Sequence, residues 1–342
     1  MSHRVTIESS GHQFDVEPGN TILRAALAAG IGLPYGCRNG ACGACKGRVV
    51  SGQVDRGLYS EGALSGAELG KGYALFCCAR PLSDLVIESR EVDAVRDIPV
   101  KMLPARVQKM ARLAPDVMLL QLKLPASERL QFLAGQYIDI LLKDGRRRSF
   151  SIANAPETDE CLELHVRRVP GGHFTTHVFE TMKERDLLRL EGPHGGFHLR
   201  EDGAKPVILL AGGTGFAPVK AMVEHAFHRQ SLRPMTLYWG ARDRAGLYLH
   251  ELAEGWAAGR AGFDYVPVLS EPAAGDGWPG RTGLVHRAVM ADFPDLSGHR
   301  VYACGAPAMI EAARSDLIGG CGLKEEDFFA DSFTFATDST RP

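Results

Sequence analysis

The sequence predicts a chain of several domains: a small α+β domain, an antiparallel β domain and an α/β domain with a parallel sheet. Three observations support this division. The length of 342 residues exceeds that of one small domain. A cysteine-rich loop follows two short strand patterns and a helix pattern near the N-terminus. Beyond residue 206 the hydrophobic pattern changes from short alternating runs to strand followed by helix. We place the domains at 1–92, 103–201 and 202–342, with a linker at 93–102.

The cysteine-rich loop has the spacing C-x4-C-x2-C, with a distant fourth cysteine. This is the plant-type ligand pattern of a [2Fe-2S] cluster. Glycines in the loop allow the backbone to fold tightly round the metal and to point amide N–H groups at sulfur. A zinc site, the alternative, prefers two C-x2-C knuckles or mixed Cys/His ligands, and this loop has one knuckle and no nearby histidine. The predicted ligands are Cys37, Cys42, Cys45 and Cys77.

Short elements surround this loop in a recognisable order. Val5–Ile7 and Phe14–Val16 predict a hairpin, and either Asn20 or Thr21 is suited to cap the short helix that follows. After the last ligand, Pro81–Glu88 has the apolar pattern of a closing strand. The order strand, strand, helix and cluster loop is that of a β-grasp ferredoxin, and this part of the chain resembles the plant-type ferredoxins throughout.

Cys78 competes with Cys77 for the fourth ligand position. Ferredoxins of this type place the ligand four residues before a proline, which favours Cys77 because Pro81 follows at that spacing. We interpret Cys78 as a small buried thiol. The remaining cysteines lie far apart in the sequence, in contexts unlike a disulfide framework.

Charge and hydropathy give no reason to expect a nucleic acid or a membrane as partner. The net charge is only −2. The N-terminus begins directly with a strand pattern, and no apolar run approaches membrane-spanning length. We therefore expect a cytoplasmic protein.

The middle of the chain predicts a second, all-β domain. The segment Asp93–Pro104 mixes charged residues with prolines and lacks a long periodic pattern, which favours a linker, and the new domain begins near Lys101. From Ala105 to about Glu191, short alternating runs are separated by Pro, Gly and Asp turns. That pattern predicts an antiparallel barrel.

Arg148-Ser-Phe-Ser151 is the first chemical motif of this domain. It resembles the R-x-[YF]-S motif of the ferredoxin–NADP reductase superfamily, whose members bind FAD against a six-stranded barrel. The resemblance implies that Arg148 pairs with the flavin pyrophosphate, that Phe150 lies against the flavin and that Ser151 bonds near flavin N5. A guanidinium suits a diphosphate, and a hydroxyl can follow a change of protonation at N5. Phe150 replaces the commoner tyrosine, and we expect FAD binding to survive that change.

Taken alone, the run Arg146–Arg148 would indicate only a solvated turn. Two further motifs follow in the family's order. Gly171–Thr175 matches G-x-x-[ST], in which Gly172 and Thr175 open a helix whose N-terminal amides hold the pyrophosphate. Gly192–Gly195 matches the G-P-x-G turn that ends the barrel. The same resemblance implies four further cofactor-binding residues, namely Tyr137, Ser149, His165 and Val166.

The third domain begins with a strand at Val207–Leu210, a glycine loop at Ala211–Pro218 and a helix. Backbone amides at such a loop can approach a pyrophosphate where side chains are absent, although three glycines also make an ordinary turn. The loop resembles the family's nicotinamide motif G-G-T-G-x-A-P, and Val301–Met309 resembles its C-G-x-P-x-M segment. The resemblance implies a nicotinamide site made of Gly212, Gly213, Thr214, Gly215, Pro218, Arg242, Cys304, Gly305, Pro307 and Met309.

The resemblance places the Cys304 thiol beside nicotinamide C4. An inert core thiol is the alternative, and we favour a positional role because hydride transfer needs no thiolate. The C-terminal segment Phe328–Phe333 resembles the family's last strand, in which an aromatic ring covers the flavin until nicotinamide displaces it. Core packing explains the first two phenylalanines better, so Phe333 is the candidate cover. Ser151, Cys304 and Phe333 are thus the catalytic candidates.

Nearly the whole chain resembles the iron–sulfur flavoprotein reductases with an N-terminal ferredoxin. These include the reductase components of bacterial oxygenases and the CDP-6-deoxy-Δ3,4-glucoseen reductases. Nicotinamide gives up two electrons as a hydride, whereas a [2Fe-2S] cluster accepts one at a time, so FAD must mediate between them. We expect electrons from NAD(P)H to reach a partner oxygenase through FAD and the cluster. A deoxysugar dehydrase is the alternative partner, and a redox-sensing protein without turnover is a third possibility.

The choice between NADH and NADPH depends on the residues after the second strand of the third domain. A 2′-phosphate needs a basic pocket, which Arg242 and Arg244 could supply. Asp243 between them argues against it, and we favour NADH over NADPH. Around the cluster loop, Arg38, Asn39 and Ala41 are the residues expected to meet the partner.

Overall fold

The computed structural model describes residues 2–40, 42–91, 98–275 and 277–333. They form two compact units. Unit 1 contains the described residues of 1–99 together with 195–197 and 330–333, and unit 2 contains those of 100–194 and 198–329. Within this described part, none of the helices has both the length and the apolar character needed to cross a membrane.

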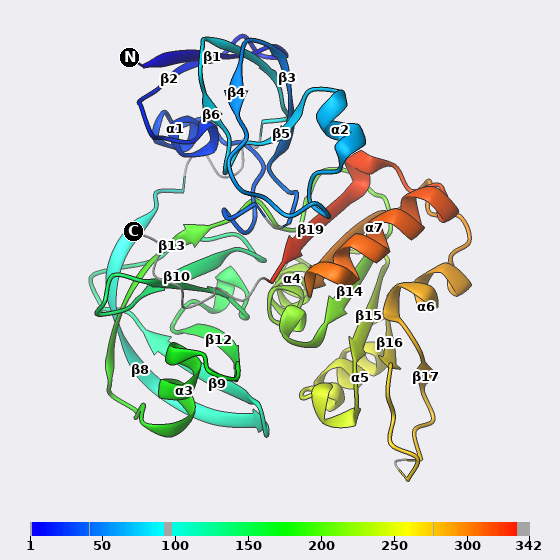
Figure 1. Cartoon of the computed structure of the whole chain (residues 1–342). Helices are drawn as coiled ribbons and strands as arrows, with labels where there is room; N and C mark the ends of the chain where they lie inside the picture. Colours follow the sequence, from blue (N-terminus) through cyan, green and yellow to red (C-terminus); the bar gives the residue numbers. More distant parts are fainter. Residues whose placement is uncertain (1, 41, 92–97, 276, 334–342) are drawn as a thin grey trace. The chain divides into compact units, whose positions relative to one another are not determined.

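Unit 1 is built on a five-stranded mixed sheet in the order β2-β1-β7-β3-β5, drawn in blue tones in Figure 1. The strands are β1 (His3–Ile7), β2 (Gln13–Val16), β3 (Lys46–Ser51), β5 (Tyr73–Leu75) and β7 (Leu85–Glu88). Strand β1 is antiparallel to β2 and parallel to β7. A separate pair consists of β4 (Val54–Asp55) and β6 (Arg80–Pro81). The predicted hairpin and the predicted last strand are therefore both present.

Two short helices accompany this sheet, α1 (Ile22–Ala28) and α2 (Gly66–Gly70). Thr21, not Asn20, caps α1, because its hydroxyl oxygen accepts a hydrogen bond from the amide of Arg24 at 3.3 Å. The apolar residues Ile22 and Leu23 of α1 are buried against the sheet core. This packing fixes the start of the chain that leads into the cysteine loop.

Unit 2 begins with a six-stranded antiparallel sheet in the order β11-β10-β13-β8-β9-β12. Its strands are β8 (Lys101–Ala114), β9 (Val117–Lys123), β10 (Tyr137–Leu141), β11 (Arg147–Ser151), β12 (Leu162–Arg167) and β13 (Leu187–His194). The two edge strands meet at an isolated antiparallel bridge between Ile152 and Leu164. Among the described residues we find no continuous ladder that closes the sheet into a barrel.

Strand β8 begins at Lys101, and Pro104 lies inside it and pairs with Arg189 of β13. Pairing of β8 with β9 starts only at Arg106, so the proline faces no neighbouring strand on that side and removes no ladder hydrogen bond there. The turn predicted at 192–195 lies largely within a strand, because β13 continues through Gly192 to His194. A side chain at Gly192 would lie 2.7 Å from Ile138 Cγ2, so glycine is needed there for close packing within the sheet.

The second half of unit 2 contains a sheet in the order β17-β16-β15-β14-β18, and Figure 1 shows its elements from yellow-green to orange. Strand β14 pairs in parallel with both β15 and β18, and β15 pairs in parallel with β16. The strands are β14 (Val207–Gly212), β15 (Met235–Ala241), β16 (Phe263–Leu269), β17 (Arg281–Thr282) and β18 (Arg300–Gly305). A further strand, β19 (Phe328–Ser332), has its last three residues in unit 1. The predicted parallel sheet is thus observed.

Four helices connect these strands: α4 (Phe216–His228), α5 (His250–Gly259), α6 (Val285–Asp292) and α7 (Pro307–Cys321). Helix α4 packs against β14 and β18, and α5 packs against β16. Because parallel strands all end at one edge of the sheet, the segments that follow β14, β15 and β18 meet there. This edge carries the predicted nicotinamide residues.

Candidate functional site

The four predicted cluster ligands come together in unit 1. Cys42, Cys45 and Cys77 are buried, and Cys37 is half-buried. The amide of Cys37 donates to Cys42 Sγ at 3.4 Å, and the amide of Cys77 donates to Cys45 Sγ at 3.4 Å. The neighbouring Cys37 thiol and burial raise the pKa of the Cys42 thiol, and the Cys45 thiol raises that of Cys77. Buried thiols that lie close together have raised pKa values, because ionising a second thiol would place two negative charges side by side.

This donor set fits a [2Fe-2S] cluster. Four sulfur atoms with backbone amides directed at them are the ligand shell that such a cluster uses, and iron stabilises the thiolates that the protein alone disfavours. The fold of the loop depends on glycine at position 40, where φ is +81°. A side chain there would lie 2.8 Å from the carbonyl oxygen of Leu58 and 2.9 Å from Cys78 Sγ. Ala41, expected to face the partner, lies outside the described residues.

Cys78 lies beside the ligand group. Its Sγ is 3.5 Å from Cys77 Sγ and packs against Gly40, whereas Cys77 is in contact with Cys45 as well. The geometry therefore favours Cys77 over Cys78 as the fourth ligand.

Asp331, which sequence patterns did not single out, lies beside the cluster loop within unit 1. It is buried, and its Oδ1 is 3.0 Å from the point where a side chain on Gly36 would begin. Burial, and to a smaller degree the neighbouring Cys37, raise its pKa to about 7. Some 290 residues separate it from the loop, so no local pattern links the two.

The flavin motif occupies β11 in unit 2. Ser151 is 6% exposed, and its Oγ has no hydrogen-bond partner among the described residues. A buried hydroxyl of this kind fits a polar atom of a bound cofactor. Arg148 is half-buried and donates from Nη1 to the carbonyl of Arg147 at 2.8 Å. Phe150 packs on Phe174, with ring centroids 5.3 Å apart.

Helix α3 (His173–Glu180) begins where the second flavin motif predicts, with Gly172 at the N-cap. The Thr175 hydroxyl accepts a hydrogen bond from the amide of Val169 at 3.1 Å, so it holds the preceding loop against the helix. Its oxygen also lies 3.2 Å from the carbonyl of Gly172. The helix N-terminus is thereby fixed relative to β12.

The side chains of His165 and Val166 are not available to a cofactor. Val166 is fully buried in the core, and the His165 ring bonds to Glu163 and Tyr248. Both residues lie on β12, an edge strand, so their backbone groups are the part left to bind a ligand. Tyr137 is buried, with its ring 5.5 Å from that of His194.

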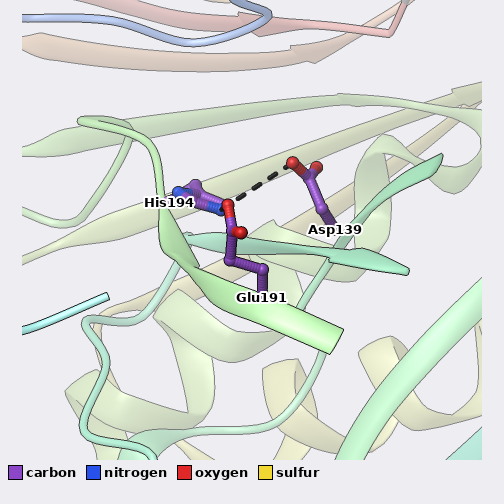
Figure 2. Close-up of side chains that lie close together, drawn as sticks. All are labelled: Asp139, Glu191 and His194. Atoms are coloured by element: carbon purple, nitrogen blue, oxygen red, sulfur yellow. Dashed lines mark ion pairs between the residues drawn. The ribbon is translucent and has the colours of Figure 1, made fainter. Parts of the chain in front are cut away.

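Asp139, Glu191 and His194 converge on one point of the antiparallel sheet, as Figure 2 shows. Their possible ligand atoms all lie within 4.8 Å of one another, a spacing that could hold a metal ion. Arg147, however, forms an ion pair with Glu191 and approaches Asp139 to 3.7 Å, while the Ser149 hydroxyl donates to Asp139 at 2.6 Å. A cation already lies against both carboxylates, and we interpret the group as an ion-pair cluster that joins β10, β11 and β13.

The glycine loop after β14 packs directly on the end of β18. Ala211 pairs with Cys304, and a side chain at Gly215 would overlap the carbonyl oxygen of Cys304. A side chain at Gly212 would lie 2.5 Å from Met309 Sδ. At both positions the absence of a side chain leaves space for neighbouring atoms of the protein. These glycines therefore have a packing role in addition to their expected role in nucleotide binding.

Gly213 faces a residue that the motifs did not identify, Arg167 at the end of β12. A side chain on Gly213 would begin 3.4 Å from Arg167 Nη1. The guanidinium forms an ion pair with Asp116 at 3.5 Å, and its buried Nη2 has no hydrogen-bond partner in the described ranges. A cation beside a phosphate-type loop fits a dinucleotide pyrophosphate. Arg167 lies in a strand and outside the motifs, so the sequence alone did not identify it.

The remaining predicted nicotinamide residues fall at the same sheet edge. Cys304 is fully buried at the end of β18, and Gly305 follows it there. Thr214 is half-buried, Pro218 lies buried in α4, Arg242 is exposed just after β15, and Pro307 begins α7. Phe333 follows β19 and belongs to unit 1, and its role stays a prediction.

Unit 2 also contains a cavity of about 560 Å³, lined by polar residues that include Glu163, Lys220 and Glu224. None of the predicted cofactor residues lines it.

Three family models match the chain in succession. They describe a 2Fe-2S iron–sulfur cluster binding domain over residues 5–82, an oxidoreductase FAD-binding domain over 104–199 and an oxidoreductase NAD-binding domain over 209–315. The chain is 42% identical to the CDP-6-deoxy-L-threo-D-glycero-4-hexulose-3-dehydrase reductase of Yersinia pestis, across 97% of this chain and 99% of that protein. It is also 42% identical to the reductase component of phenol 2-monooxygenase from Pseudomonas sp. strain CF600, across 99% and 96%.

The chain belongs to the iron–sulfur flavoprotein reductases. It is an oxidoreductase whose domains bind a [2Fe-2S] cluster, FAD and NAD(P)H. The crystal structure of a cytochrome P450 reductase from Amycolatopsis matches this reductase with a TM-score of 0.78 at 36% identity, covering 98% of this chain and all of that one. The resemblance inferred from the motifs is confirmed.

The two adjacent cysteines provide a matched pair of variants. We expect Cys77→Ser to abolish the visible absorbance of the iron–sulfur cluster, because it removes a ligand in contact with Cys45. Cys78→Ser should leave iron content and absorbance close to those of the unmodified reductase. Iron analysis and absorption spectra of the two purified variants measure the difference. The opposite pattern would show that Cys78 is the ligand.

Proposed function

We propose that this reductase takes a hydride from NADH and delivers single electrons to a separate terminal oxygenase. The observation that supports this best is that one chain carries both a nucleotide-type loop packed on Cys304 and a loop with four converging thiols. When bound, FAD accepts the hydride and releases its electrons one at a time. The two loops are then the entry and the exit of an electron path.

The residues of unit 2 would hold the two nucleotides as follows. Arg148 and the N-terminus of α3 bind the FAD pyrophosphate, and the orphaned Ser151 hydroxyl bonds near flavin N5. Phe150 and Tyr137 contact the flavin, and Ser149 braces β11 on Asp139. Backbone groups of His165 and Val166 bind the cofactor at the strand edge. We propose that the sheet functions as a barrel closed at the Ile152–Leu164 bridge.

The nicotinamide dinucleotide would lie along the sheet edge formed by β14, β15 and β18. Gly213, Thr214 and Gly215 present backbone groups to the pyrophosphate, and Arg167 supplies a positive charge from the other side. Cys304 sets the position of the nicotinamide ring next to Gly212, Gly305 and Met309, which pack together. Pro218 and Pro307 begin or brace the flanking helices.

In unit 1, a β-grasp sheet carries the cluster on Cys37, Cys42, Cys45 and Cys77. Arg38 is half-buried and Asn39 is exposed beside the ligands, so both are suited to meet a partner. We propose domain limits of 1–92, 103–201 and 202–342, with a linker at 93–102.

A terminal oxygenase is the partner we favour, since relatives matched over nearly their whole length are reductase components of phenol and terephthalate oxygenases. A sugar dehydrase is the second candidate, because a relative of equal identity is named a dehydrase reductase. In either case the partner approaches the cluster loop in unit 1.

Turnover measures the proposed function directly. The holoprotein with NADH should reduce ferricyanide and cytochrome c through many cycles. Immobilised holoprotein should then capture an iron oxygenase from a lysate of the source organism, and the mixture should consume oxygen with NADH. Capture of a dehydrase would favour the second candidate. Bleaching of the flavin and cluster by NADH without any turnover would instead indicate a redox sensor.

The preference for NADH depends on Asp243. Its exposed carboxylate accepts a hydrogen bond from the amide of Gly246 at 2.9 Å and stands between Arg242 and Arg244. A negative charge at this point repels a 2′-phosphate.

We therefore expect Asp243→Asn to raise kcat/KM for NADPH by roughly fivefold, since the amide can still accept the Gly246 hydrogen bond without the charge. Asp295→Asn is the control. The Asp295 carboxylate likewise accepts a hydrogen bond from a loop amide at 2.9 Å, but it comes before the start of β18, whereas the predicted nicotinamide residues lie at the end of that strand. Steady-state kinetics with both nucleotides measure the effect. An unmodified protein that prefers NADPH would contradict the proposal.

A further inference from the structure

A chain of polar contacts runs through unit 2 from α4 to β12. It begins at Lys220, which is only 7% exposed. Lys220 Nζ lies 2.9 Å from a carboxylate oxygen of Glu224 and 3.1 Å from one of Glu163, and it donates to the carbonyl of Ala153 at 3.2 Å. A buried ammonium is tolerated only with partners of this kind. The carboxylate of Glu163 is thus held at a defined place.

The next contacts have a fixed hydrogen-bond direction. Burial alone would raise the pKa of Glu163, but the hydrogen bond from His165 and the charge of Lys220 lower it to about 2. Burial lowers the pKa of His165, so its ring is neutral and carries one N–H. The ionised Glu163 can only accept, so Nε2 of His165 donates to it at 3.1 Å. Nδ1 is left to accept the hydroxyl of Tyr248 at 3.0 Å.

The ring of Tyr248 continues the chain to the glycine loop. It stands edge-on to Trp239 at 5.2 Å and to Phe216 at 6.1 Å. Trp239 and Phe216 are stacked with centroids 3.8 Å apart, and Trp239 Nε1 donates to the carbonyl of Gly213 at 3.0 Å. Phe216 is the first residue of α4, directly after the loop. Tyr248 therefore touches the aromatic pair that supports the loop and, through its hydroxyl, bonds to β12.

We propose that Tyr248 is a positioning residue for hydride transfer. Through its hydrogen bond to His165 it fixes the glycine loop, and hence the nicotinamide, relative to the strand that carries the flavin-binding backbone. This inference rests on the proposed function, since it concerns the transfer step. The rate of such a step depends steeply on the alignment of the two reacting rings. A small displacement of the loop therefore slows the reaction without removing either cofactor.

The test is Tyr248→Phe, which removes one hydroxyl and keeps the ring. We expect anaerobic flavin reduction at saturating NADH to slow by roughly tenfold, because about one hydrogen bond of positioning energy is lost at the transition state. Flavin content and reduction by dithionite should stay unchanged. Hydrogen–deuterium exchange should become faster over residues 211–216, a readout that does not depend on turnover.

Tyr265→Phe is the matched control. The Tyr265 hydroxyl also bonds to a histidine Nδ1, that of His250, at 3.0 Å, and it is likewise partly exposed. Burial raises the pKa of both phenols. Within the described part of the chain, the Tyr265 ring packs on that of His250, 5.6 Å away, and not on Trp239 or Phe216, so the loss of its hydroxyl should leave the rate of flavin reduction and the exchange of the loop unchanged.

A second pair of variants keeps the test decisive if Tyr248→Phe does not fold. A glutamine at position 165 places its amide where the imidazole Nε2 was, so it keeps the hydrogen bond to Glu163 and loses the one to Tyr248. An asparagine at position 165 places its amide where Nδ1 was, so it keeps the hydrogen bond to Tyr248 and loses the one to Glu163. His165→Gln should therefore slow flavin reduction more than His165→Asn. Equal rates for Tyr248→Phe and the unmodified reductase, or equal slowing in Tyr265→Phe, would overturn the inference. A reductase whose flavin neither NADH nor NADPH reduces would contradict the proposed function itself, and this inference with it.

Discussion

The close packing of two parallel strand ends is the constraint on which the nucleotide site depends. Strands β14 and β18 are neighbours, so the glycine loop after one must pass over the last residues of the other. Gly215 has no room for a side chain against the Cys304 carbonyl, and Gly212 has little against Met309. Both motifs therefore form one surface, and neither would be placed correctly without the other. The hydrogen bond from Trp239 to Gly213 adds β15 to the same surface.

In unit 1 a comparable constraint comes from the burial and the close approach of the cysteine thiols. The thiols of Cys42 and Cys77 have raised pKa values because other cysteines lie against them in a buried loop. A protein that gathers thiols in this way disfavours each thiolate until a metal balances the charge. Metal binding and the fold of the loop are therefore coupled. One-electron chemistry therefore belongs to unit 1, and hydride chemistry belongs to unit 2.

Much of this organisation follows from the sequence, because its motifs are local. The first three cysteines of the cluster loop, the flavin motif and the glycine loop each lie within about a dozen residues, and periodic hydrophobic runs predicted the strands beside them. Contacts between distant segments were not predictable in this way. Asp331 beside Gly36 and Arg167 beside Gly213 depend on how the chain folds back. The position of Pro104 inside β8 was equally hidden, because a proline is tolerated there only since pairing with β9 has not yet begun.

On this interpretation, electrons from the nucleotide site in unit 2 reach the cluster in unit 1. Electron paramagnetic resonance of the anaerobic holoprotein, recorded before and after NADH is added, measures this transfer. We expect no cluster signal before addition and, afterwards, the signal of a reduced [2Fe-2S] cluster in most of the molecules. A flavin that bleaches with NADH while the cluster stays oxidised and silent would contradict it.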